Sequence, residues 1–454
     1  MKKIKFIPLL ALISLFFSCE KLADINENPN VPTDVPMETL LPPAEYAMAN
    51  MYGRETFTYA GIFSQQIEGT NNQELNTENY NPDELFVNNL WSDYYAGPMI
   101  NLKIIIEKAA ETNSPHYEGV AKVLMANCLG SLTCIWGDAP YSDALEGPDN
   151  LYPTYDPQEV IFTTIQDLLD DAITALESPE SIFSPGPDDI IYNGNLQKWI
   201  KAAYSLKARY YLQTSKVNSG ISSTALQMAE QGISSINGDL AYPFMGTSVD
   251  GNPIYGYYEI TPNSVVDPQF INILDSLNDP RKPYLVSIIP FTGGLTKPGP
   301  AVASIDSPLE FMSYVENLFI IAECKLRDGD IISAQEFLSD AVETSMDQLS
   351  DAELDQSTID QFISDNVQLG NDFEENLSII ISQKYIALFT QLQAWNDYRR
   401  TAYPYLYPNA DGASASNPSG QIPRRLIYPQ SERILNINAP IPFPNMQEKF
   451  WWDQ

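Results

Sequence analysis

Apolar residues recur every three to four positions along most of the chain after about residue 95, which is the spacing of one face of an α-helix. The clearest stripes are Val120, Leu124, Cys128, Leu132 and Ile135; Ile161, Ile165, Leu168, Ala172 and Leu176; Trp199, Ala203, Leu206 and Tyr210; Val315, Leu318, Phe319, Ala322 and Leu326; and Leu377, Ile381, Leu388, Leu392 and Trp395. The last stripe ends near Arg400. The pattern therefore predicts a mainly all-α protein.

The predicted helices come in pairs. The short turn Asp328-Gly329-Asp330 separates two of them and forces them to pack antiparallel, and the helix around Trp199 has a partner near residues 223–236. Each hairpin is apolar on a face that it cannot cover alone. We therefore expect a tetratricopeptide-like stack of helical hairpins, with its scaffold over about 95–238 and 308–400.

One predicted helix has a recognisable start. In Asp156-Pro157-Gln158-Glu159 the aspartate is placed to accept hydrogen bonds from the first free amides, proline occupies the first helical position, and glutamate can complete a capping box. We expect the helix to begin there, with Asp156 as its cap.

Three long stretches, about 54–90, 239–307 and 401–454, carry most of the Pro, Gly, Asn and Tyr residues. They are too long to be simple connections within a compact domain, and long ordered loops usually hold the function. We predict that these irregular segments form the ligand-binding part of the protein.

The N-terminus has the pattern of a signal peptide. Lys2, Lys3 and Lys5 precede the apolar run Phe6–Phe17, whose length falls well short of the ~20 residues that cross a bilayer as a helix. Cys19 follows directly after a small residue, as in bacterial lipoproteins, although an ordinary secretory signal is the alternative. We expect residues 1–18 to be removed, Cys19 to be lipidated, and residues 19–454 to form a single domain.

Composition excludes several classes of function. The chain has 25 Lys and Arg against 59 Asp and Glu, a net charge of −34, so a nucleic-acid partner is not expected. There is 1 histidine, His116, which excludes a metal site built on several imidazoles. Besides Cys19 the chain has three cysteines, at 128, 134 and 324, an odd number that cannot all form disulfides within the chain. We expect these three to be buried and unpaired. No metal or cofactor is predicted.

Carboxylates are the only candidates for catalysis. Glu316 and Glu323 are two helical turns apart and share a face, so they could act as an acid/base pair. The alternative is that they form ion pairs with arginines, and Arg399, Arg400, Arg424 and Arg425 lie in suitable settings. We favour the ion pairs, and we expect no catalytic residues and no enzyme.

Several blocks of the sequence resemble one known family. They are Tyr117–Leu124 continuing to Ile135–Leu145, Lys207–Leu212, Pro308–Glu316 with Ala322 and Glu323, Trp395–Pro404, Ile422–Pro429 with Glu432 and Asn436, and the Trp451-Trp452-Asp453 ending. In this order they are similar to the SusD/RagB outer-membrane nutrient-binding lipoproteins of Bacteroidetes. The resemblance implies a tetratricopeptide-based scaffold with an irregular ligand-binding part, which acts as a lid on a SusC-like TonB-dependent transporter.

Ligand contacts are expected from tyrosines in the irregular segments. Tyr80 lies in an Asn-rich stretch, and Tyr255, Tyr257 and Tyr258 lie in Asn252–Glu259. Exposed aromatic rings can stack on a sugar face, and neighbouring amide side chains can hydrogen-bond its hydroxyls. The alternative is that these tyrosines pack the loops against the scaffold.

Together these observations predict a lipid-anchored, cell-surface protein of the outer membrane. It is expected to bind an extracellular nutrient, most simply an oligosaccharide, and to deliver it to the transporter unchanged. A peptide or another polymer is the alternative ligand. A helical glycoside hydrolase and a pure protein-interaction scaffold are the competing hypotheses.

Overall fold

The computed structural model describes residues 35–260, 263–290, 292–349 and 354–454. The predicted signal peptide and Cys19 lie outside these residues. The helices are α3 (Met37–Met51), α4 (Phe57–Phe63), α5 (Asn72–Glu78), α6 (Glu84–Tyr94), α7 (Ile100–Glu111), α8 (Pro115–Trp136), α9 (Gln158–Leu176), α10 (Leu196–Gln213), α11 (Ile221–Ala229), α12 (Pro253–Ile260), α13 (Pro268–Leu277), α14 (Lys282–Leu285), α15 (Pro300–Ala303), α16 (Tyr314–Arg327), α17 (Ile331–Asp347), α18 (Gln356–Asn366), α19 (Phe373–Ala387), α20 (Leu392–Thr401) and α21 (Gln430–Leu435).

Short irregular helices and strands complete the described residues. Two π-helical turns are η2 (Tyr52–Thr56) and η3 (Tyr95–Met99), and short 3₁₀ turns are η4 (Gly147–Asp149), η5 (Ile236–Gly238) and η6 (Trp451–Asp453). The strands are β1 (Ile67–Gly69), β2 (Leu240–Tyr242), β3 (Ser264–Val266), β4 (Val286–Ile288), β5 (Thr296–Pro298) and β6 (Leu309–Met312). They form antiparallel two-stranded sheets in the pairs β1–β3, β2–β6 and β4–β5.

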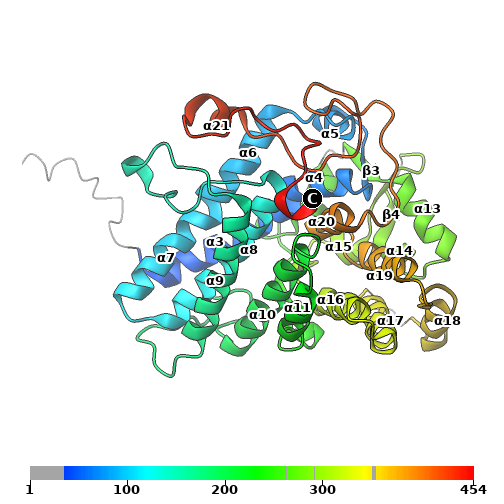
Figure 1. Cartoon of the computed structure of the whole chain (residues 1–454), viewed down its shortest axis with the longest axis horizontal. Coiled ribbons are helices and arrows are strands. Elements are labelled where there is room, and N and C mark those ends of the chain that lie inside the picture. Colours follow the sequence, from blue (N-terminus) through cyan, green and yellow to red (C-terminus); the bar gives the residue numbers. More distant parts are fainter. Residues whose placement is uncertain (1–34, 261–262, 291, 350–353) are drawn as a thin grey trace, which may run out of the picture.

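The long helices pack side by side in one row, as the sequence pattern predicts. In Figure 1 the row runs from α7 and α8 through α9, α10 and α11 to α16, α17 and α19, and each helix contacts its neighbours. The mainly α-helical fold class with stacked hairpins is confirmed. Helix α8 is long and apolar enough to span a membrane. Because 94% of its most apolar stretch is buried inside the protein, it is the central core helix.

The N-terminal segment differs from the sequence prediction. Residues 54–90, expected to be irregular, consist mostly of η2, α4, α5 and α6. These helices are too short to show a helical repeat of apolar positions, and their stability comes from packing. Helix α3 contains Pro42 and Pro43, which hides it from a pattern search.

The stretch predicted as one helix up to Arg400 is divided into α19 and α20. Thr390 takes a left-handed backbone conformation with φ 74°. Its amide donates to Oε1 of Gln66, 2.8 Å away, and so leaves the helical pattern. A side chain distant in sequence therefore fixes the break.

The cap of α9 also differs from the prediction. Asp156 accepts hydrogen bonds from the amides of Tyr141 and Ser142 instead of capping the helix. The amide of Gln158 donates to Asp138, which directly follows the glycine that ends α8. The end of one helix thus caps the start of the next.

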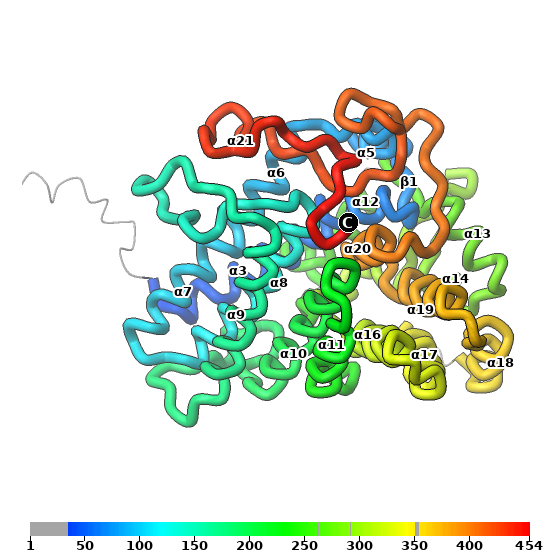
Figure 2. Tube along the Cα trace, viewed as in Figure 1, coloured from blue at the N-terminus to red at the C-terminus, as the bar shows by residue number. Residues whose placement is uncertain are grey.

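The segments that follow the row of helices return to its N-terminal part. Pairing of β1 with β3 places Ile67 opposite Val266 and so joins residues 67–69 to 264–266. The chain after α20, orange to red in Figure 2, crosses beside α5 and β1, where the amide of Asn409 donates to the hydroxyl of Tyr80. The three segments predicted to bind ligand therefore meet on one side of the scaffold.

Candidate functional site

Two cavities are candidates for a ligand site. The first, which we call the scaffold cavity, has a volume of about 460 Å³ and lies between the β2–β6 pair and helices α10, α19 and α20. The second, which we call the Tyr257 cavity, has a volume of about 440 Å³ and lies between the segments that contain α4, α5 and α12. Either could hold part of an oligosaccharide, so their chemistry must distinguish them.

The polar groups of the scaffold cavity are paired within the protein. Asp239 accepts from the amide of Tyr314 at 2.6 Å and from Nε2 of Gln348 at 2.9 Å. Glu310 accepts from Nε2 of Gln391 at 3.0 Å. Burial and the nearby Glu310 carboxylate raise the pKa of Asp239 to about 8. None of the described residues lining this cavity has a buried side-chain nitrogen or oxygen without a partner.

The Tyr257 cavity combines aromatic faces with amide and charged groups. Its wall is formed by residues of α3, η2, α4, α5, the start of α6, and α12. The lining residues are Asn50, Gly53, Arg54, Glu55, Phe57, Thr58, Tyr59, Gln73, Glu74, Thr77, Asp83, Phe86, Pro253, Gly256, Tyr257 and Ile260. This composition suits a sugar, because rings can stack on its faces while amides and carboxylates bond its hydroxyls.

Close packing of α12 on η2 forms one wall of this cavity. A Cβ atom on Gly53 would lie 2.4 Å from Cγ of Pro253 and 2.7 Å from Cδ1 of Leu309. Only glycine permits this approach. The wall that carries Tyr257 is therefore held against residues 52–56 by the absence of a side chain at position 53.

Glu74 is the central polar group of the Tyr257 cavity. Its side chain is 1% exposed. Oε1 accepts from the hydroxyl of Tyr257 and from Nε2 of Gln73, each at 3.2 Å. Among the described residues, Oε2 of Glu74 and Oε1 of Gln73 have no hydrogen-bond partner. The cavity thus contains two buried acceptors with unused capacity, which is costly unless a donor arrives.

Burial raises the pKa of several ionisable groups of the cavity. Burial raises the pKa of the Tyr59 and Tyr257 hydroxyls, so both remain protonated donors. Burial also raises the pKa of the Glu55 carboxyl. Arg54 is exposed at the margin and makes no ion pair among the described residues.

The structure places one of the predicted tyrosines in this cavity. Tyr257 is half-buried and lines it, whereas Tyr255 is half-buried and lines neither cavity. The solvent exposure that we expected is absent at Tyr80 and Tyr258, which are 2% and 4% exposed. The Tyr80 hydroxyl accepts from the Asn409 amide, and the Tyr258 hydroxyl contacts Oγ of Ser264 at 2.9 Å. These two rings hold the irregular segments together.

Sequence reasoning missed most of the cavity. Short helices carry Arg54, Phe57, Tyr59 and Phe86, and no pattern along these helices separates a lining position from a core position. The one usable signal was the polar run around residues 71–82, which supplies Gln73, Glu74 and Thr77.

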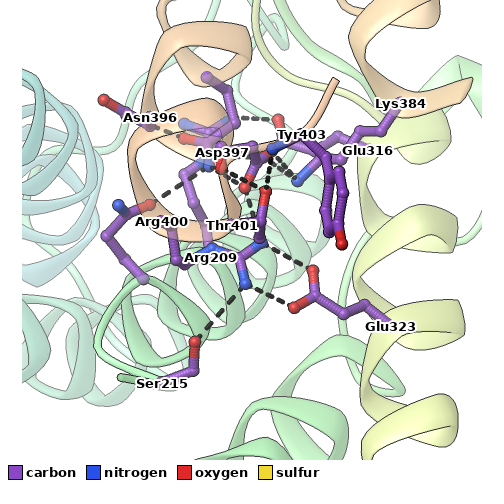
Figure 3. Close-up of polar contacts among 12 residues, drawn as sticks. Arg209, Ser215, Glu316, Glu323, Lys384, Asn396, Asp397, Arg400, Thr401 and Tyr403 are labelled. Atoms are coloured by element: carbon purple, nitrogen blue, oxygen red, sulfur yellow. Dashed lines mark hydrogen bonds and ion pairs between the residues drawn. The ribbon is translucent and has the colours of Figure 1, made fainter. Parts of the chain in front are cut away.

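Glu316 and Glu323, considered as an acid/base pair, form ion pairs as we favoured. Figure 3 shows this buried charge cluster, which consists of Arg209, Glu316, Glu323, Lys384, Asp397 and Arg400. Arg209 binds Glu316 through two nitrogens, and Nη2 of Arg400 lies 2.7 Å from Oε2 of Glu323 and 2.8 Å from Oδ1 of Asp397. Nζ of Lys384 lies 2.8 Å from Oδ2 of Asp397. Because Arg400 and the neighbouring cations stabilise the ionised form despite burial, the pKa of Glu323 is lowered to about 2.

The other arginines follow the expectation only in part. Arg424 pairs with Asp453, as predicted. Arg399 has no carboxylate partner among the described residues; it donates to the carbonyl oxygens of Cys134 and Arg424 and its guanidinium lies 3.6 Å from the centre of the Trp395 ring. Arg425 donates to the carbonyl of Trp136 and lies over Phe450. Stacking and carbonyl contacts replace the predicted ion pairs at these two positions.

The remaining candidate residues have structural surroundings. Cys128, Cys134 and Cys324 are buried and unpaired, as predicted. The ring nitrogens of His116 contact Oγ of Ser184 and the carbonyl of Ser178. Within the described ranges, no three His, Cys, Asp or Glu side chains are grouped so that they could hold a metal ion.

Comparison with known proteins gives the same fold. The family described as "Starch-binding associating with outer membrane" (SusD-like) matches residues 29–429. A chitin-binding protein of known structure is 23% identical with a TM-score of 0.78, covering 92% of this chain and 100% of its own. A SusD/RagB family protein from Bacteroides thetaiotaomicron is 22% identical with a TM-score of 0.77, and the shares covered are 92% and 99%.

A third similar structure is a chitin-binding SusD homologue from Flavobacterium johnsoniae. It is 21% identical with a TM-score of 0.77, covering 90% of this chain and 98% of its own. None of the curated proteins matches the sequence. The family match extends over most of the chain, and each of the three similar structures covers at least 90% of it. This chain therefore belongs to the SusD-like family, whose members bind carbohydrate in association with the outer membrane.

Proposed function

We propose that this protein is a cell-surface lipoprotein, anchored through Cys19, that captures an extracellular oligosaccharide and delivers it unchanged to a SusC-like TonB-dependent transporter. Membership of the SusD-like family supports carbohydrate binding at the outer membrane. The chitin-binding proteins of similar structure support a glycan rather than a peptide as ligand. The Cys19 motif supports the anchor.

The observation that carries the ligand part of the proposal is the composition of the Tyr257 cavity. Aromatic rings at positions 57, 59, 86 and 257 line the same cavity as two buried acceptors without partners. Neutral sugars carry both a flat apolar face and hydroxyl donors, and so they match such a site. We assign Tyr257 as a direct ligand contact, and Tyr80 and Tyr258 as residues that hold the surrounding segments.

The test is calorimetric titration of the lipid-free protein, residues 20–454, with neutral glycans and with peptides, followed by product analysis. We expect saturable heat with a glycan, and the glycan recovered intact. Tyr257→Ala should weaken binding by about tenfold, because a stacking ring is lost. Tyr255→Ala is the matched control and should bind like the wild type. Heat with peptides alone would contradict the glycan proposal, and cleaved glycan would contradict capture without chemistry.

Anchoring and delivery need a separate test in cells. We expect Cys19→Ala to release the protein from the outer membrane, and we expect the wild-type protein to co-purify with a β-barrel transporter. A Cys19→Ala protein that remains in the outer membrane of cells lacking the transporter would contradict lipid anchoring.

A further inference from the structure

The unpartnered oxygen of Glu74 gives information about the chemistry of the ligand. Glu74 is 1% exposed, and its Oε2 atom has no partner among the described residues. The Tyr257 hydroxyl and Nε2 of Gln73 both donate to the other oxygen of this carboxylate, Oε1. A group from outside the protein must therefore supply the donor for Oε2.

Charge around this atom favours a cation. Three carboxylates, Glu55, Glu74 and Asp83, line the Tyr257 cavity, and its one guanidinium, Arg54, is exposed at the margin. Asp83 already caps α6 through the amide of Leu85, at 2.8 Å. No Lys, Arg or His contacts Glu74 within ion-pair distance in the described part of the chain. A buried carboxylate without a counter-charge is unfavourable, and a cationic donor relieves both the missing bond and the missing charge.

We propose that the sugar captured in the Tyr257 cavity carries a free amino group and that its ammonium binds Oε2 of Glu74. This inference rests on the proposed function, since it names the class of oligosaccharide that the same cavity takes. A neutral hydroxyl satisfies the hydrogen bond but leaves the charge unpaired, and an N-acetyl group offers an amide donor without charge. A sugar acid would add a like charge beside three carboxylates. The cavity is therefore selective for unacetylated amino-sugar units.

The experiment compares three oligosaccharides of the same length and linkage: a glucosamine oligomer, an N-acetylglucosamine oligomer and a glucose oligomer. Each is titrated into the lipid-free protein and into two variants. Glu74→Gln has nearly the same shape but no charge. Glu259→Gln is the control, because Glu259 lies on α12, the helix that carries Tyr257, but pairs with Lys297 and does not line the cavity.

We expect the wild-type protein to bind the glucosamine oligomer about tenfold more tightly than the other two. Glu74→Gln should remove this preference, so that the three oligosaccharides bind the variant with affinities within about twofold of one another, and Glu259→Gln should retain the preference. The wild-type comparison depends only on the ligands and so tests the inference even if Glu74→Gln does not fold.

Two contrary results have different meanings. Equal binding of all three oligosaccharides, unchanged by Glu74→Gln, would overturn the amino-sugar inference and leave glycan capture intact. Absence of binding to every glycan would contradict the proposed function itself, and with it this inference.

Discussion

Arg399 and Arg400 are neighbours in the chain, yet their guanidinium groups are stabilised in different ways. Arg400 faces Glu323 and Asp397, whereas Arg399 lies on the Trp395 ring and donates to carbonyl oxygens. Successive helical positions point about 100° apart, so one side chain reaches the charged centre of the scaffold and the other reaches the C-terminal segment. Trp395 and Asp397 lie on the same helix as the two arginines, whereas Glu323 and the carbonyl oxygens come from other parts of the chain, which the sequence alone does not place.

Replacement of Arg400 should be strongly destabilising. Arg400→Met leaves Glu323 and Asp397 buried with fewer cations, and we expect the free energy of unfolding to fall by about 3–5 kcal/mol. Lys282→Met removes one member of an exposed pair with Asp275 and should cost at most about 1 kcal/mol. Urea denaturation followed by circular dichroism measures both values. A loss for Arg400→Met no larger than that for Lys282→Met would contradict the importance assigned to the buried charge cluster.

The helix N-termini show which capping residues can be predicted from the local sequence and which cannot. Asp330 caps α17 through the amide of Ser333, in the short turn that the sequence pattern identified. For α9 the nearby Asp156 is bonded elsewhere and the distant Asp138 takes its place. Long helices and their pairing could be predicted, since their apolar stripes are local. The short helices around the cavity and the break at Thr390 could not, because packing and side chains distant in sequence determine them.

Removal of the α9 cap tests this assignment. Asp138→Ala should lower the free energy of unfolding by about 1 kcal/mol, because the amide of Gln158 loses its acceptor. Asp138→Asn keeps an acceptor at the same position and should restore most of the stability. Thermal or urea denaturation provides the measurement, and equal stability of all three proteins would argue against the cap.

Packing between η2 and α12 provides a second test at the level of elements. Gly53→Ala places a methyl group 2.4 Å from the Pro253 ring, so α12 must move away and the Tyr257 cavity must change shape. We expect a loss of about 1–3 kcal/mol in stability together with weaker glycan binding. Gly97→Ala is a matched control in the other π-helical turn, where the nearest atom would be at an ordinary 3.5 Å. Normal binding by the Gly53→Ala protein would contradict this role of the close contact.

The whole molecule is strongly acidic, and its titrating groups give opposite pH dependences. Burial raises the pKa of Glu78 and of Asp267 to about 7. The folded protein therefore binds more protons than the unfolded chain between about pH 4 and about pH 7, and stability falls as pH rises through this range. The pKa of Glu323 is lowered instead, so its contribution is present above about pH 4 and is lost as pH falls toward about 2.

We accordingly expect the melting temperature to be highest near about pH 4 and to decrease on both sides. Calorimetry across the pH range gives the curve. Asp267→Asn retains a side-chain oxygen that can cap α13 through the amide of Gln269, but it cannot ionise. This variant should therefore flatten the decline on the alkaline side. A melting temperature that rises steadily to pH 8 in the wild-type protein would contradict the raised pKa values.

The pairing of β1 with β3 also has a consequence for how the protein is made. Residues 50–86 supply most of the Tyr257 cavity, but the wall formed by α12 and the strand that holds it come from residues 253–266. A chain synthesised from its N-terminus exposes the apolar rings of the first half long before their cover exists. The ligand site is thus completed late in folding. Truncated or slowly folding chains would expose an aggregation-prone apolar surface in place of a binding site.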